Sequence, residues 1–244
     1  MKRFLLVTLG ITGLYLGLDL LWLSLTPTLE ALFESRTAAA WDREAGEVTS
    51  AAREADGRLA PEMRVAAYRL GFHVGYSSNV LGSVALSSPE VQAQVREILA
   101  PRLKGIEALG QQLGIGEVTL LPVTNADEFG RVNDRLDADE IGLAARLEKV
   151  TSRRHRHLLL LGMHLGVAAA LADMSGGTLQ NPLRQYIGHH ATVARVPPAV
   201  WEPAARVHEA ATQEQSVKAY QDALAALEAA IGQLGPLPPA DGSP

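Results

Sequence analysis

Two short stretches of the chain share one pattern: Tyr68-Arg-Leu-Gly71-Phe-His73-Val-Gly75 and Leu159-Leu-Leu-Gly162-Met-His164-Leu-Gly166. Their glycines and histidines align at an offset of 91 residues. Ser88-Pro89 follows the first stretch and Asn181-Pro182 the second, and each pair is typical of a capped, proline-initiated helix start. A polar segment precedes each stretch. This agreement in motif and order predicts that the chain contains a duplicated helical unit.

The glycine spacing within each stretch predicts how the two units meet. Gly71 and Gly75 lie four residues apart, as do Gly162 and Gly166, so each pair falls on one face of a helix. Two such faces allow close contact between helices. We expect an all-α helical bundle of two duplicated helical-hairpin units that pack about a pseudo-twofold axis. The histidine between each pair of glycines should point away from that contact.

The N-terminal segment predicts a membrane anchor. Residues 4–25 are 22 residues that contain one charge, Asp19, which is long enough to cross a hydrocarbon layer of about 30 Å. Lys2 and Arg3 precede this segment and favour an N-terminus in the cytoplasm. The expected location is therefore the inner membrane, as a single-pass protein with its C-terminal domain in the periplasm or outside.

A signal peptide is the alternative for the same segment. It has a basic start and an apolar stretch too, but it also needs a small-x-small cleavage site. Bulky residues fill the place of that site, among them Leu20, Trp22 and Leu25. The anchor is therefore favoured; cleavage would make the protein secreted or periplasmic.

Glycine and proline positions divide the rest of the chain. The expected parts are a membrane anchor or uncleaved signal at 1–26, a first helical unit at 27–114, a linker at 115–125, a second helical unit at 126–233 packed on the first, and a disordered tail at 234–244. Within the first unit, Pro101 should kink or split its helix. Within the second, 126–151 reads as one polar helix.

The very apolar run at 158–172 has two interpretations. It is 15 residues long, whereas a membrane span needs about 20. Arg153, Arg154 and Arg156 precede it and would lie outside the cell, against the positive-inside bias. A buried core helix is the favoured interpretation.

Composition excludes several classes of function. The formal net charge is −5, which gives no electrostatic basis for nucleic-acid binding. The chain has no cysteine, so disulfides, thiolate metal sites and cysteine nucleophiles are excluded. No nucleophile elbow, phosphate loop, dinucleotide fingerprint, paired-histidine zinc helix or calcium loop is present.

His73 and His164 are the first candidates for a ligand site. They are either core histidines bonded to backbone or hydroxyl groups, or symmetric ligands of one metal ion or one b-type haem between helices. Aromatic residues make up only 5% of the chain, which argues against a haem pocket. No cofactor is expected by default, with haem or metal as the alternative.

Four further residues are candidates for a small polar pocket near the pseudo-axis. They are Asn79, Asp173, Arg184 and Tyr186, and Asp173 is expected to bond a backbone group or Arg184.

The remaining histidine motifs favour non-ligand roles. His189 and His190 are adjacent and point about 100° apart on a helix, so they should not chelate as an i,i+4 pair does. His155 and His157 lie within an arginine-rich helix start, which reads as solvated or as a weak anion site.

The function that these patterns favour is non-enzymatic: a membrane-anchored envelope protein with a helical binding or scaffold domain. The alternative is a haem- or metal-binding helical bundle that uses His73 and His164. The expected partners are the membrane, through the N-terminal helix, and an envelope protein or a second copy of the chain. Ligand identity and catalysis are left open, because the lack of known motifs is weak evidence against an enzyme.

Overall fold

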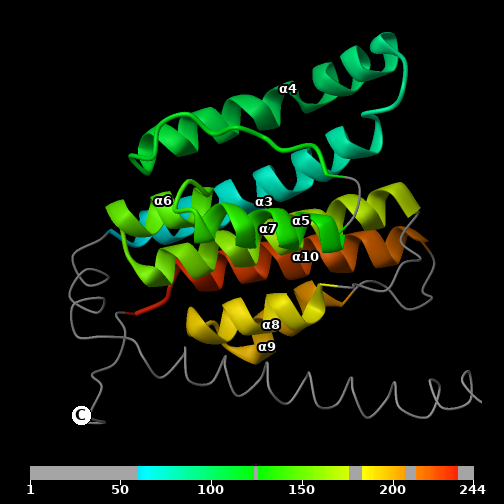
Figure 1. The fold of residues 1–244 in the computed structure, drawn as a ribbon. Helices are drawn as coiled ribbons and strands as arrows, with labels where there is room; N and C mark the ends of the chain where they lie inside the picture. The colour runs from blue at the N-terminus through cyan, green and yellow to red at the C-terminus, as the bar shows by residue number, and fades with distance from the viewer. Residues whose placement is uncertain (1–59, 124–125, 176–182, 207–212, 236–244) are drawn as a thin grey trace, which may run out of the picture. The chain divides into compact units, whose positions relative to one another are not determined.

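The computed structural model describes residues 60–123, 126–175, 183–206 and 213–235, all of which belong to one compact unit, Val48–Pro244. All regular secondary structure in the described part is α-helical, with no strand, which confirms the all-α prediction for these residues. The helices are α3 (Pro61–Ser83), α4 (Pro89–Gln112), α5 (Ala126–Ala138), α6 (Leu143–Val150), α7 (Arg153–Ser175), α8 (Arg184–Val193), α9 (Pro198–Ala205) and α10 (Gln213–Gly232) (Figure 1). The predicted anchor at 1–26 lies outside the described residues.

The centre of the bundle is the crossing of α3 with α7, the most extensive contact between two helices. A Cβ atom on Gly71 would lie 1.9 Å from the carbonyl oxygen of Leu159, and one on Gly162 would lie 2.1 Å from that of Tyr68. No side chain fits in either place, so the two backbones touch directly. The predicted glycine-mediated crossing is confirmed.

The contacts at this crossing are reciprocal. Gly75 meets the carbonyl oxygen of Met163, and Gly166 meets that of Phe72. Phe72 and Met163 are separated by the same 91 residues as the glycines. The two helices run in the same direction and exchange equivalent contacts, as a local twofold axis between them requires.

The flanking helices differ more between the two proposed units. α4 packs on α3 and α8 packs on α7, which keeps the predicted order. However, α4 has 24 residues and α8 has 10. Asn181 and Pro182 lie outside the described residues, so the duplication of whole hairpins stays a prediction.

The start of α4 follows the predicted cap, and of the two effects predicted for Pro101, a kink or a split, the split does not occur. Ser88 accepts a hydrogen bond from the backbone N–H of Val91, and Pro89 occupies the first turn. Pro101 lies inside α4 without dividing it. Proline removes one backbone donor but leaves the other bonds of a long helix in place, so a split was the wrong expectation.

The segment 126–151 forms two helices, where one was expected. The chain turns at Glu140, which has a φ of 58°, and α6 begins after Gly142. The Asp137 carboxylate accepts a hydrogen bond from the backbone N–H of Ala145, so it satisfies a donor at the new helix start. A Cβ on Gly142 would lie 2.0 Å from that carboxylate oxygen and 2.9 Å from the backbone nitrogen of Asp137, so a larger residue would displace the capping carboxylate.

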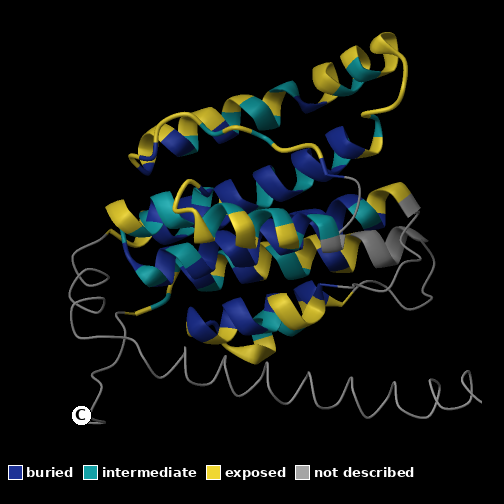
Figure 2. Cartoon of the chain, viewed as in Figure 1, coloured by how far each residue is buried: buried dark blue, intermediate teal, exposed yellow. Residues whose placement is uncertain are grey.

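The apolar run in α7 lies in the core. Within the described residues, only α7 is long and apolar enough to cross a membrane, and 83% of its most apolar window is buried inside the bundle. Leu158, Leu159, Leu161 and Leu165 are fully buried. Figure 2 shows the buried colour along much of α7. The predicted core helix is confirmed.

Candidate metal centre

Arg154, His155 and His157 at the start of α7 are buried, contrary to the expectation of a solvated or anion-facing surface, whereas Arg153 and Arg156 are partly exposed. Arg154 donates from Nε to the carbonyl oxygen of Ala194 at 2.9 Å and from Nη1 to that of Gly235 at 2.7 Å. His155 is fully buried, and its Nδ1 shares a 2.7 Å hydrogen bond with Ser152 Oγ. Arg154, which was expected on the surface, therefore links α7 by hydrogen bonds to the chain just after α8 and just after α10.

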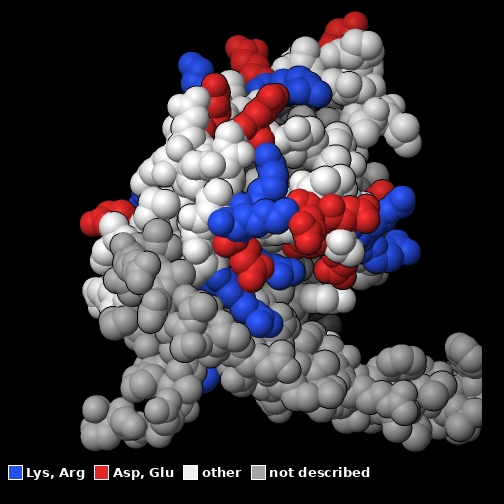
Figure 3. Space-filling model, turned by 60° about the vertical axis from the view of Figure 1, so that its left-hand side comes forward, with Lys and Arg blue, Asp and Glu red and all other residues white. Residues whose placement is uncertain are grey.

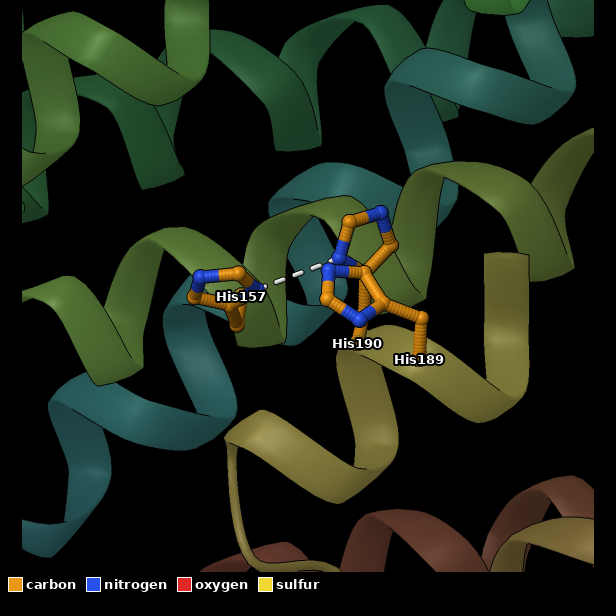
Figure 4. A group of neighbouring side chains, drawn as sticks. All are labelled: His157, His189 and His190. Carbon is orange, nitrogen blue, oxygen red and sulfur yellow. Dashed lines mark hydrogen bonds between the residues drawn. The ribbon is translucent and has the colours of Figure 1, made fainter. Parts of the chain in front are cut away.

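Three histidines meet between α7 and α8. His157 of α7 is 1% exposed, and His189 and His190 of α8 are each 8% exposed. Each offers one ring nitrogen, and these three nitrogens lie within 4.8 Å of one another. Figure 4 shows the three rings directed into the same space.

His189 and His190 lie close together, and the expectation that they do not chelate as an i,i+4 pair does stays a prediction. Their rings diverge along α8, yet the centroids lie only 4.8 Å apart. His157 approaches from the facing helix, with its ring centroid 5.6 Å from that of His189 and 5.3 Å from that of His190. The three imidazoles come together without an i,i+4 pair, because the third one, His157, lies on another helix.

The cluster has the composition of a transition-metal site. Imidazole nitrogen suits zinc, copper, iron and nickel, and Zn–N bonds are about 2.0–2.1 Å long. Tetrahedral ligands at that radius are roughly 3.4 Å apart. The Nδ1 atoms of His157 and His190 are already 3.1 Å apart. All three ligand nitrogens lie within 4.8 Å of one another, so small side-chain movements would bring them to this spacing.

A fourth imidazole borders the cluster. The ring centroid of His164 lies 5.1 Å from that of His190 and 5.3 Å from that of Tyr186, with the tyrosine ring parallel within 1°. Phe129 of α5 meets His164 edge-on at 6.3 Å. His164 is therefore enclosed by aromatic rings and by the cluster.

Burial and one hydrogen bond determine the protonation state and the tautomer of His164. Burial lowers the pKa of His164 to about 4, so the ring is neutral near neutral pH. A neutral ring that bonds a carbonyl oxygen must be the donor, and Nδ1 lies 2.7 Å from the carbonyl oxygen of Leu160. Nδ1 therefore carries the proton, and Nε2 carries the lone pair.

His73, the predicted counterpart of His164, has different neighbours. Arg102 of α4 donates from Nη1 to Nδ1 of His73 at 3.1 Å, and its guanidinium lies 4.1 Å from the centroid of the Tyr76 ring. Burial, and then the charge of Arg102, lower the pKa of His73. Since Arg102 can only donate, Nδ1 accepts and Nε2 holds the proton. A metal ion at His73 would have to displace Arg102.

The other four predicted site residues have separate surroundings, and no hydrogen bond, ion pair or ring contact between any two of them is found in the described part of the chain. Tyr186, which is 43% exposed, stacks on His164. Asp173 accepts a 2.8 Å hydrogen bond from Tyr76 Oη, where a backbone group or Arg184 was the expected donor. Arg184 is exposed on α8. Asn79 is fully buried in α3, and neither atom of its amide has a hydrogen-bond partner within the described part of the chain.

Charged side chains around α5, α6 and α7 form ion pairs. Figure 3 shows basic and acidic groups interleaved on one face. Arg156 pairs with Glu148 at 2.9 Å and with Asp137 at 3.7 Å, and Lys149 pairs with Glu140 at 2.7 Å. These pairs link α5, α6 and α7 and contribute little to stability individually.

Comparison of the chain with family models, with curated proteins and with solved structures finds no match. The candidate site therefore depends on its own geometry.

Sequence analysis missed His157, His189 and His190. One signal was available: His157 directly precedes the apolar run Leu158–Leu161, and it shares a helix face with His164, seven residues on. The sequence did not predict that α8 packs against the face of α7 that carries His157 and His164.

Proposed function

We propose that the chain is a membrane-anchored envelope protein whose helical domain binds one divalent transition-metal ion, with His157, His189 and His190 as ligands. The observation that carries this proposal is the convergence of three buried imidazole nitrogens within 4.8 Å.

The donor set favours zinc or copper(II). All three ligands are borderline nitrogen donors. Within the described residues, the metal-ligand group contains no carboxylate, which is the preferred donor of magnesium and calcium. We take zinc as the first ion to test.

The test is zinc binding by the full chain, purified in detergent and stripped with a chelator. We expect one zinc per chain by equilibrium dialysis. His157→Ala, His189→Ala and His190→Ala should each weaken binding at least tenfold. His73→Ala is the matched control, because it removes a partly buried histidine of α3 that bonds Arg102, and it should bind like the wild type.

Three results would contradict this assignment. Zinc binding that survives all three cluster substitutions would exclude these ligands. Loss of zinc in both His73→Ala and His164→Ala, with the cluster variants unaffected, would favour the paired histidines predicted from the sequence. A Soret band in the purified protein would identify haem instead.

Trp201 offers a second readout close to the site. Its indole ring lies 3.0 Å from the position of a Cβ on Gly188, the residue before His189. Copper(II) bound at the cluster should quench its emission. Because Trp22 and Trp41 also emit, the quenched component is measured as the difference between the wild type and Trp201→Phe.

The membrane anchor needs a separate test. Residues 4–25 and the preceding Lys2 and Arg3 support it. The full chain should stay in the membrane fraction after an alkaline wash. Recovery of a shortened, detergent-free soluble chain would contradict the anchor and favour a cleaved signal.

A further inference from the structure

His164 stands next to the proposed ligands without belonging to the three. It lies two helical turns after His157 on the same face of α7, and it is 4% exposed. Its ring is inclined at 32° to that of His190, with the centroids 5.1 Å apart. No other described histidine outside the three approaches His190 with a ring contact.

The hydrogen bond to Leu160 prepares His164 as a ligand. Nδ1 donates to a backbone carbonyl oxygen, so the lone pair is on Nε2. Metal-ligating histidines usually hold their second ring N–H in this way, because the bond fixes both the tautomer and the ring orientation. The described structure gives Nε2 no hydrogen-bond partner. The Tyr186 ring is stacked on the imidazole, with the two centroids 5.3 Å apart.

We infer that His164 supplies the fourth ligand through Nε2, so that the metal is held by four imidazoles and has no open position for water. This inference rests on the proposed metal centre. Nε2 is not within the 4.8 Å group in the metal-free arrangement, so the ring must turn toward the ion about its two side-chain torsions. His157 and His164 then coordinate the ion from α7, and His189 and His190 coordinate it from α8.

The fourth ligand decides the class of the site. Three protein ligands and one water make a catalytic zinc site, whereas four protein ligands make a structural or storage site. A closed four-histidine site would agree with the non-enzymatic function that the sequence favours. It would bind α8 to α7 and so stabilise the bundle when loaded.

The test uses cobalt(II) as a spectroscopic substitute for zinc in the full chain, with azide as a probe for an open position. The wild type should show the visible absorption of tetrahedral cobalt, and azide should leave it unchanged. His164→Leu should bind cobalt at least tenfold more weakly, and azide should change its spectrum. Tyr186→Phe keeps the stacked ring and removes only the hydroxyl, so it should behave like the wild type.

The outcomes separate the two proposals. If the wild type binds no cobalt and no zinc, the metal centre itself is wrong. If the wild type binds cobalt and its spectrum responds to azide, the centre exists with an open position and His164 is not a ligand; this result needs no variant to fold. Unchanged affinity in His164→Leu, with no response to azide, would also overturn the fourth ligand.

Discussion

The Nδ1 atoms of His157 and His190 lie 3.1 Å apart in the buried space between α7 and α8. Two imidazole nitrogens bond at this distance only when one carries a proton and the other does not. In the metal-free protein the pair is therefore one donor and one acceptor. When a metal ion binds, it replaces this shared proton contact.

We predict that the two histidines are energetically coupled in the chelator-treated protein. His157→Ala and His190→Ala each remove the same hydrogen bond, so the double variant should cost less than the sum of the single variants by about 1 kcal/mol. Urea unfolding of the four proteins measures this. His73→Ala combined with His190→Ala is the control and should be additive within about 0.5 kcal/mol. Additive costs for His157 and His190 would refute the coupling.

The stability of the metal-free protein should fall in acid because of His164. Its pKa is lowered to about 4 in the folded state, mainly by burial, and is about 6.5 in the unfolded chain. Between these values the unfolded chain binds more protons, so stability is complete above pH 6.5 and is lost as the pH falls toward 4. The loss amounts to about 3 kcal/mol for this group.

Urea unfolding in the presence of a chelator, at pH values across this range, measures the effect. His164→Leu has no group to protonate at this position, so between pH 6.5 and 4 it should lose about 3 kcal/mol less stability than the wild type. His73→Ala is the control, and its loss should still include the contribution of His164. If the free energy of unfolding changes with pH in the same way for the wild type and His164→Leu, His164 has the same pKa in the folded and unfolded states, and the prediction is wrong.

Substitution of the crossing glycines should destabilise the bundle strongly. A methyl group on Gly71 or Gly162 would overlap a backbone oxygen of the facing helix, and backbone cannot move as a side chain can. Gly71→Ala and Gly162→Ala should each cost at least about 3 kcal/mol by thermal or urea unfolding. Gly130→Ala in α5 is the control, since nothing lies within 4 Å of its Cβ position. It should raise stability by about 0.5–1 kcal/mol.

The bond from Arg102 to His73 should be visible in the titration of that histidine. Arg102→Met removes the positive charge that contributes to the lowered pKa of His73, so the pKa should rise, as followed by NMR. Stability should fall by about 1 kcal/mol, because the guanidinium also lies over the Tyr76 ring. Arg102→Lys keeps the charge and should leave the pKa closer to that of the wild type. An unchanged pKa in Arg102→Met would show that burial and the charge of Arg69, and not Arg102, lower the pKa of His73.

Part of this fold could be predicted because its signals are local. Helical spacing of apolar residues, the Ser88-Pro89 start and the glycines four residues apart depend on neighbours along the chain. The same spacing placed the glycine faces of α3 and α7 in contact. The break at Gly142 was missed because it depends on Asp137, whose carboxylate caps the next helix only after the chain has turned.

The sequence by itself determined that the described part is helical, that α7 is a core helix and that Gly71 and Gly162 mark the central crossing. It also excluded thiolate chemistry, since the chain has no cysteine. Only the tertiary structure decided which histidines meet. His157 and His190 are 33 residues apart, and their contact requires α8 to pack on the face of α7 that carries both His157 and His164. That packing is set by shape and burial summed over many side chains, for which a single sequence carries no local signal.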